Sequence, residues 1–348
     1  RRHTNFSMES IQQTWNGGAN SSSGRCTATI SRNGDLVHKL YFQIDTSNST
    51  SQDSASFTTC DNPGCAWIDT VSVEIGGQTI DKQYGSWLET WAELTEVNPT
   101  GVIAGAQENA SKATVAADGN DFSNTLFQRM AGMGGVTQGS GDDGLGREAL
   151  NSGRYFYVPL QFWFCRNPGL ALPLIALQYH EVKIIVEHKF GSVYEASKAD
   201  QQLWADYIYL DTDERRRFAQ VSHEYLIEQL QMQEDSGNST TVDLNFNHPV
   251  KELVWTGAWS VPGSSIGTNG TNTTLVGDNT TSAQTYLLKL NGHDRFAPRP
   301  VTYFTQAQVH QYHSGPGGLN VAKYSAAAGA SGSLVNNFDD SIAVYSFA

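Results

Sequence analysis

The sequence predicts an all-β protein built from sandwich domains, and two features of composition and one pattern support this. Charged residues make up only 16% of the 348 residues, which is low for a chain rich in surface helices. The 33 glycines, together with many Ser, Thr and Asn residues, supply the turns that a series of short strands needs. Val71, Val73 and Ile75 alternate with polar residues, as in a strand that buries one face.

The other predicted strands follow from the same signals. The Gly76-Gly77 pair after the first strand is typical of a tight hairpin leading into Thr79 and Ile80. Residues 155–164 are dense in aromatic and β-branched side chains, residues 182–186 alternate, and residues 204–210 form a further apolar and aromatic run. We expect these segments to be strands of a sandwich with one face in the core.

One helix is predicted near the middle of the first half. Ser86 followed by Glu89 fits a capping box, and Trp87, Leu88, Trp91 and Leu94 then share one helical face. A row of Trp side chains could bind a sugar, but its helical spacing favours a role in the core.

The chain resembles itself at an offset of 215 residues. This offset carries Arg1-Arg2 onto Arg216-Arg217, and it carries the hairpin at 75–78 onto residues 290–293. A single offset at two separate places indicates a duplicated domain. The charge-rich segment around 211–221 then separates the copies, which gives a first domain at 1–211, a linker at 212–222 and a second domain at 223–348. A second copy as long as the first would run past Ala348, so we expect the second domain to be truncated at its C-terminus, with exposed strand edges.

Several stretches are similar to a known family, the major capsid proteins of nucleocytoplasmic large DNA viruses, and most of all to those of algal viruses. The longest is residues 167–183, NPGLALPLIALQYHEVK. The similarity covers nearly the whole chain, and the other stretches are residues 1–14, 31–36, 74–82, 223–230 and 291–297. Residues 46–66, 97–152 and 256–283 depart most from the shared pattern.

This resemblance implies the fold and the role of the chain. It implies two tandem eight-stranded jelly-roll sandwiches, a double jelly roll, in agreement with the duplication. It further implies a homotrimer that forms a pseudo-hexagonal capsomer and tiles an icosahedral shell, in contact with neighbouring capsomers and with minor capsid proteins beneath. The shell overlies an internal membrane that the chain does not span. The protein is then a structural component of the virion, assembled in the host cytoplasm, and not an enzyme.

Charge and hydropathy exclude two other classes of partner. The net charge of −13 disfavours a surface that tracks phosphates, so we expect no direct contact with nucleic acid. The longest apolar run, residues 170–177, contains Pro173 and is far shorter than the ~20 residues that span a bilayer. We therefore expect no transmembrane span in this sequence.

Four cysteines are too few for a disulfide scaffold of this length. We expect most of them to be buried thiols. Cys60 and Cys65 bracket a turn-forming Asp-Asn-Pro-Gly sequence that could bring the two sulfurs together or only reverse the chain.

No catalytic, cofactor-binding or metal-ligating residues are predicted. Residues 139–144 fit the letters of a dinucleotide-binding loop, but no apolar strand precedes them and two aspartates would repel a pyrophosphate. His310 and His313 lack a nearby third metal ligand. His180 and His223 are each followed by Glu without the second histidine of a zinc protease, so we expect them to form ordinary hydrogen bonds.

Glycosylation is the best supported modification. Eight Asn-x-Ser/Thr sequons occur, about twice the number expected by chance from the composition. Asn5 and Asn20 are the weakest of them, because assembly contacts would cover them. The candidate sites for N-linked glycans are Asn269, Asn272, Asn279, Asn238, Asn48 and Asn109.

Two other classes of function remain open at this point. A jelly roll can also be a carbohydrate-binding, lectin-like protein with exposed Trp or Tyr side chains, or it can be the scaffold of an enzyme. Glycan binding would favour the first, and convergent carboxylate or histidine side chains in a pocket would favour the second.

Overall fold

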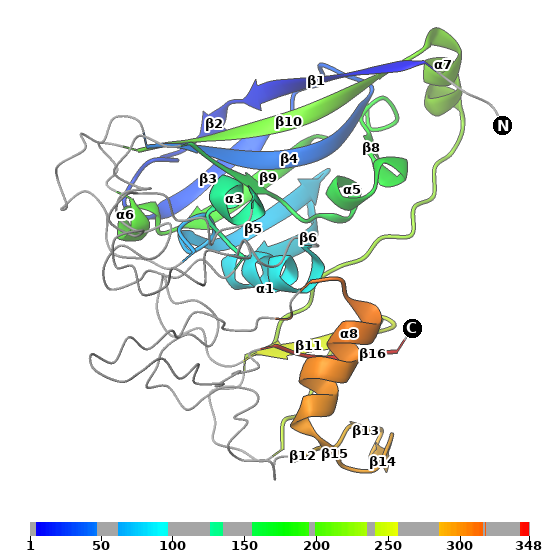
Figure 1. The fold of residues 1–348 in the computed structure, drawn as a ribbon. Helices are drawn as coiled ribbons and strands as arrows, with labels where there is room; N and C mark the ends of the chain where they lie inside the picture. Colours follow the sequence, from blue (N-terminus) through cyan, green and yellow to red (C-terminus); the bar gives the residue numbers. More distant parts are fainter. Residues whose placement is uncertain are drawn as a thin grey trace, which may run out of the picture.

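The structure is a computed structural model, and most of the first half of the chain is described in it. It describes residues 5–46, 62–96, 126–134, 155–194, 199–234, 241–256, 285–315, 317 and 342–347. Two antiparallel sheets face each other in the first half, and a smaller group of strands and helices lies beside them (Figure 1).

The first sheet carries strands from both ends of the first half. Its order is β1-β10-β4-β7, with the short β8 paired to the start of β4. The bounds are β1 (Phe6–Gln13), β10 (Asp200–Leu210), β4 (Leu36–Asp45), β7 (Tyr155–Pro159) and β8 (Leu172–Pro173).

The second sheet has the order β2-β3-β9-β5-β6. The bounds are β2 (Trp15–Asn16), β3 (Gly24–Thr29), β9 (Val182–His188), β5 (Ile68–Ile75) and β6 (Gln78–Tyr84). Without the two-residue strands β2 and β8, eight strands remain. Numbered along the chain, they form one sheet in the order 1-8-3-6 and another in the order 2-7-4-5, which is the arrangement of a jelly roll. The predicted jelly-roll sandwich is therefore confirmed for the first half.

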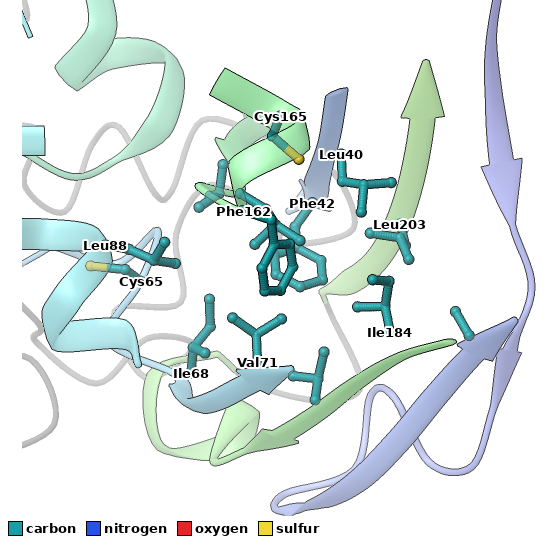
Figure 2. Close-up of a cluster of buried hydrophobic side chains, with 14 of the residues drawn as sticks. Leu40, Phe42, Cys65, Ile68, Val71, Leu88, Phe162, Cys165, Ile184 and Leu203 are labelled. Atoms are coloured by element: carbon teal, nitrogen blue, oxygen red, sulfur yellow. The ribbon is translucent and has the colours of Figure 1, made fainter. Parts of the chain in front are cut away.

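Alternation along the strands builds the core between the sheets. Leu40, Phe42 and Ile44 of β4 point inward and are buried, while the residues between them point outward. Trp67 is fully buried and meets the rings of Phe42 and Phe190 edge-on, with centroids 5.2 and 5.4 Å apart. Figure 2 shows Phe42, Phe162 and Ile184 converging between the two sheets. The predicted strands at 71–75, 182–186 and 204–210 all lie in these sheets.

The two hairpins related by the 215-residue offset have the same turn. Gly76 and Gly77 have φ of 60° and 85°, and Asn291 and Gly292 have φ of 51° and 80°. Two successive positive φ angles define the turn that matches the twist of paired strands, and Gly and Asn tolerate it. The register pairs Ile75 with Gln78 and Leu290 with His293, as the offset predicts.

The duplication is weaker at the start of the second half. The offset places the residues of β1 onto 221–228, and this segment forms neither helix nor strand. Just after it, the side-chain amides of Gln231 and Gln233 bind residues 243–247. They donate to the carbonyls of Asn247 and Asp243 and accept from the backbone N–H groups of Asn247 and Asn245. Amide side chains here take the place of a backbone ladder.

The predicted helix exists, but its start is not the predicted capping box. Helix α1 (Gly85–Thr95) follows directly from β6, with Tyr84 as N-cap and no side-chain hydrogen bond at that cap. Ser86 lies inside the helix, where its carbonyl accepts from the Thr90 hydroxyl at 2.8 Å. Glu89 is fully buried and accepts from the Gly134 backbone N–H at 2.8 Å instead of reaching back to the helix start.

The predicted strand at 155–164 is only half correct. Strand β7 ends at Pro159, and the one-turn helix α5 (Trp163–Arg166) follows. Proline has no N–H to donate to a ladder, so the chain leaves the sheet there. Phe162 and Phe164 remain fully buried because they pack into the core from this turn.

The segment predicted as a linker contains a helix that docks on the sandwich. Helix α7 (Thr212–Gln220) begins after Asp211, whose side chain caps it, and Arg215 bonds the buried Asp35 carboxylate at 2.8 Å. Phe218 packs on a small cluster that contains Leu36 and Ile208. The acidic residues in its first turn and Arg217 in its last turn suit the dipole of this helix.

The described strands of the second half form three two-stranded sheets. They are β11 (Glu252–Thr256) with β16 (Ile342–Ser346), β12 (Thr285–Tyr286) with β15 (Arg299–Pro300), and β13 (Lys289–Leu290) with β14 (His293–Asp294). A π-helical segment η3 (Tyr303–Ala307) leads into α8 (Gln308–Tyr312). The remaining short helices of the chain are α3 (Leu126–Ala131), η2 (Pro168–Leu170) and α6 (Phe190–Val193). None of the described helices is long and apolar enough to cross a bilayer.

Candidate functional site

Helix α1 joins the first sandwich to the second half, and it lies between the two in Figure 1. One side of the helix carries Leu88, which is buried in the core of the sandwich. Leu94, six residues later, is buried in a separate cluster with Val309, Ile342 and Val344 of the second half. Each side of α1 therefore belongs to a different core, and burial on both sides fixes the two halves to one element.

Backbone hydrogen bonds fasten the end of α1 to the second half. The carbonyls of Leu94 and Glu93 accept from the N–H groups of Gly315 and Gly317 at 2.8 and 3.0 Å, and the Thr95 carbonyl accepts from the Ser314 hydroxyl at 2.9 Å. The last carbonyls of a helix have no partner within the helix, so a partner from outside satisfies them. Here that partner is a segment more than 200 residues away in the sequence.

A row of charged and aromatic side chains crosses the same junction. Arg166 of α5 pairs with Glu228 at 3.0 Å, and its guanidinium lies 5.0 Å from the centre of the Trp91 ring. Glu228 also pairs with Lys251. The Trp91 ring in turn meets His313 edge-on at 6.0 Å. Arg166 thus contacts both a cation–π partner on α1 and a carboxylate at the start of the second half.

His313 ends this row beside a carboxylate. Its Nε2 lies 3.1 Å from an oxygen of Glu252, which is within ion-pair distance, although the angles do not satisfy a hydrogen bond. His310 lies on the exposed side of α8 and contributes nothing to the contact. In the part of the chain that the structure describes, no three His, Cys, Asp or Glu side chains are grouped so that they could hold a metal ion.

Asp81 binds the start of the second half at Leu230. Its side chain is nearly completely buried on β6 and accepts from the Leu230 N–H and from the Gln83 amide, both at 3.0 Å. Burial raises the pKa of this carboxyl, and the hydrogen bonds only partly oppose that shift. At Glu228 the opposite holds, because hydrogen bonding to Lys251 and the charge of Arg166 lower its pKa.

These shifts predict an acid-sensitive junction. The lowered pKa of Glu228 means that its contribution is present above the ordinary value of 4.5 and is lost as the pH falls through the lower folded-state value. Because Glu228 is about half exposed, we expect this contribution to stay below about 1 kcal/mol. Glu228→Gln should therefore lower the melting temperature slightly at pH 7. Below pH 4.5 the melting temperature of this variant should fall less than that of the wild type. Melting curves taken at successive pH values measure both effects.

Asp81→Asn is the matched control for that experiment. The raised pKa of Asp81 means that the folded state binds its proton more tightly, so its stability contribution falls as the pH rises through the folded-state pKa. Asp81→Asn removes this pH dependence. The loss of stability toward acid pH should therefore be smaller in Glu228→Gln and larger in Asp81→Asn than in the wild type. The same fall of melting temperature with pH in the wild type and both variants would contradict this explanation of the junction.

The outer face of the sheet β1-β10-β4-β7 is the second notable surface. The Trp204 and Tyr41 rings stack at 6.5 Å with planes 4° apart, and Tyr41 meets Tyr157 at 6.1 Å. Tyr157 and Tyr155 of β7 are 38% and 43% exposed. Alternation in the sequence already places these residues opposite the buried ones, so this aromatic row could have been found from the pattern. The junction contacts could not, since no local signal links Arg166 to Glu228 or Trp91 to His313.

A hollow of about 420 Å³ lies at the end of this sheet, beside β2. Gln12, Trp15, Asn20, Asp200 and Gln202 are among the residues that line it. Asp200 is the one carboxylate among its lining residues, and neither histidine nor cysteine is among them.

The predicted modification sites fall largely outside the described residues. This holds for Asn269, Asn272, Asn279, Asn238, Asn48 and Asn109, for Cys60, and for residues 139–144. Asn20 is described, and its side chain is taken up by hydrogen bonds with Asp200 and with the Gln201 backbone N–H. The expected hydrogen bonding of His223 is confirmed, since its Nε2 lies 2.7 Å from the Phe218 carbonyl. Cys26, Cys65 and Cys165 are buried, as expected.

The fold and these surfaces define a class: a jelly-roll protein with aromatic outer faces and a firmly joined second half. Comparison with known proteins gives the family. Residues 1–211 match the model of the major capsid protein N-terminus, and residues 214–332 match that of the large eukaryotic DNA virus major capsid protein. The chain belongs to the family of major capsid proteins of large eukaryotic DNA viruses.

Individual relatives agree. The chain is 44% identical over 321 residues to the major capsid protein of Pyramimonas orientalis virus, which covers 90% of the chain and 69% of that protein. It is 44% identical over 287 residues to that of Phaeocystis pouchetii virus, covering 73% of the chain and 52% of that protein. The chain therefore spans between about half and two thirds of the length of these two relatives.

A solved structure extends the likeness to the whole fold. A chain of the PBCV-1 virus capsid superposes with a TM-score of 0.64 and 31% identity, covering 100% of this chain and 79% of that one. The predicted double jelly roll is confirmed by this match. The role is that of a structural capsid component, and the comparisons do not support the lectin-like alternative.

Proposed function

We propose that three copies of this protein form a pseudo-hexagonal capsomer, the repeating unit of an icosahedral shell. The junction at α1 is the observation that carries this proposal. A chain that presents two sandwiches in a fixed relation contributes two similar corners to a ring, so three chains approximate six-fold symmetry. Two cores meeting on one helix, the backbone bonds from Gly315 and Gly317, and the Arg166 contacts hold that relation.

The finer organisation belongs to the same proposal. The first domain comprises 1–211, the connection 212–222 and the second domain 223–348. Helix α7 within that connection is anchored on the first sandwich by Arg215 and Phe218, which favours a fixed and not a freely moving connection. The net charge of −13 favours contacts with protein over contacts with the packaged nucleic acid.

The surroundings in the virion complete the proposal. The shell overlies an internal membrane without spanning it, minor capsid proteins lie beneath the capsomers, and assembly takes place in the host cytoplasm. The protein acts through its interfaces and not as an enzyme. N-linked glycans on Asn269, Asn272, Asn279, Asn238, Asn48 or Asn109 would add bulk to its loops, and peptide mass spectrometry of purified virions would detect them.

Light scattering tests the proposal directly. The full gene product that contains this chain should elute as a species with three times the mass of its own denatured chain, and it should persist on dilution. A persistent monomer, or a stable dimer with two-fold symmetry, would contradict the proposal.

A further inference from the structure

The outer face of the sheet β1-β10-β4-β7 carries a row of aromatic side chains among polar ones. The aromatic row of Trp204, Tyr41 and Tyr157 crosses three neighbouring strands. Further along the same face, Phe6 and Met8 of β1 are 63% and 48% exposed. An antiparallel sheet with one face in water normally alternates apolar and polar residues. Aromatic and Met side chains are instead enriched where a surface binds another protein.

The aromatic part of this face is acidic. Asp200 and Asp206 lie on β10 on either side of Trp204 and point outward with it. The hydrogen bonds to Asp200 come from the neutral amides of Asn20 and Gln202, and Asp206 forms no ion pair with a described residue. Lys39 also lies on this face of β4, yet it forms no ion pair with a described carboxylate. A partner that supplies positive charge would thus meet carboxylates that form no ion pair with a described residue, although Lys39 lies nearly opposite Asp206 in the register of β4 and β10.

The chain itself carries such a cationic element. Helix α7 presents Arg216 and Arg217 to solvent, and neither pairs with a described residue, whereas Arg215 is held by Asp35. The helix is anchored on the sandwich by Phe218, so its arginines are displayed on a fixed support. Guanidinium groups bind carboxylates in a bidentate manner and stack on aromatic rings, and this face offers both.

Within one chain α7 reaches the end of this face only through Phe218, which packs beside Ile208. Asp206 lies two residues before Ile208, about 7 Å along the strand at ~3.3 Å per residue, and Asp200 is about 26 Å away. Helix α7 starts beyond that end of β10, and no ion pair joins it to either aspartate. The complementary surfaces are therefore available to bind between chains.

We propose that the acidic aromatic face of one copy binds helix α7 of a neighbouring copy, with Arg216 and Arg217 placed against Asp206, Tyr41 and Tyr157. This inference rests on the proposed self-assembly and names the surfaces that carry it. The contact joins two different patches, so it is heterologous and closes into a ring when the rotation between copies permits. Copies with a net charge of −13 repel one another at long range, and a local basic helix opposes that repulsion.

A charge-swap experiment tests the pairing in the full gene product that contains this chain. Arg216→Glu with Arg217→Glu should weaken self-association at least about tenfold in sedimentation velocity, and Asp206→Lys should do the same. The three substitutions together should restore association to within about threefold of the wild type, because every interface then has the reversed pair. Tyr157→Ser should weaken association without changing the charge.

The controls separate this inference from the assembly proposal. Lys183→Glu reverses a charge on β9 of the other sheet and should leave association unchanged, and melting curves confirm that each variant folds. If none of the substitutions changes self-association, this inference is overturned and the assembly proposal is not. If each charge reversal weakens association but the combined variant does not restore it, the pairing of α7 with this face is overturned. A wild-type protein that stays monomeric would contradict the assembly proposal, and this inference with it.

Discussion

Trp67→Ala should cost about 3–5 kcal/mol of unfolding free energy, a large part of the ~5–15 kcal/mol typical of a domain. Trp67 is fully buried at the centre of the first sandwich, edge-on to Phe42 and Phe190. Its Nε1 donates to the Gly64 carbonyl at 2.9 Å, so truncation leaves both a cavity and an unpaired buried acceptor. Guanidinium denaturation followed by circular dichroism measures the loss as a lower midpoint.

Two further variants make this test specific. Trp67→Phe keeps part of the ring packing and should lose less than Trp67→Ala. Trp87→Ala removes a half-buried Trp from α1 whose ring centre lies 5.4 Å from that of Trp91, with the planes tilted by 30°, and its effect should be clearly smaller. A midpoint for Trp67→Ala within error of the wild type would contradict the placement of this residue in the core.

Gly315→Ala should release the second half from α1 while the first sandwich stays folded. A Cβ at this position would lie 2.3 Å from the Glu93 carbonyl oxygen and 2.6 Å from the Leu94 carbonyl carbon. Both are backbone atoms of a packed helix and cannot move aside cheaply. The substitution therefore breaks the hydrogen bond from Gly315 to Leu94 and separates Leu94 from Val309 and Val344.

Hydrogen exchange read by mass spectrometry distinguishes the two halves in this variant. We expect faster exchange in 302–315 and 342–347 and unchanged protection in β4, β5 and β9. Gly24→Ala is the matched control, because its added Cβ would meet only the Ser21 hydroxyl at 3.3 Å. Protection lost evenly across both halves, or lost nowhere, would contradict the account of the junction.

The first sandwich was largely predictable because its signals are local. Strands such as β5 and β9 alternate in the sequence, and the Gly76-Gly77 turn requires the residues that are present. Two local predictions failed for physical reasons. Ser86 could not cap α1 because β6 runs directly into the helix at Tyr84, and Pro159 ended a strand that composition alone would extend.

The connection between the halves contains a helix whose signal is present in the sequence. Asp211 is followed three residues later by Glu214, with acidic residues first and arginines last, which is the pattern of a capped helix. The contacts of Arg166, Trp91 and His313 are different, since they join residues far apart in the sequence and depend on how two cores meet on α1.

Single-particle electron microscopy of the full gene product tests the central claim most directly. We expect particles with a pseudo-hexagonal outline and three-fold symmetry, in which each chain contributes two adjoining jelly-roll densities. Particles in which the two halves of a chain take variable relative positions, or in which copies fail to form a closed ring, would contradict it.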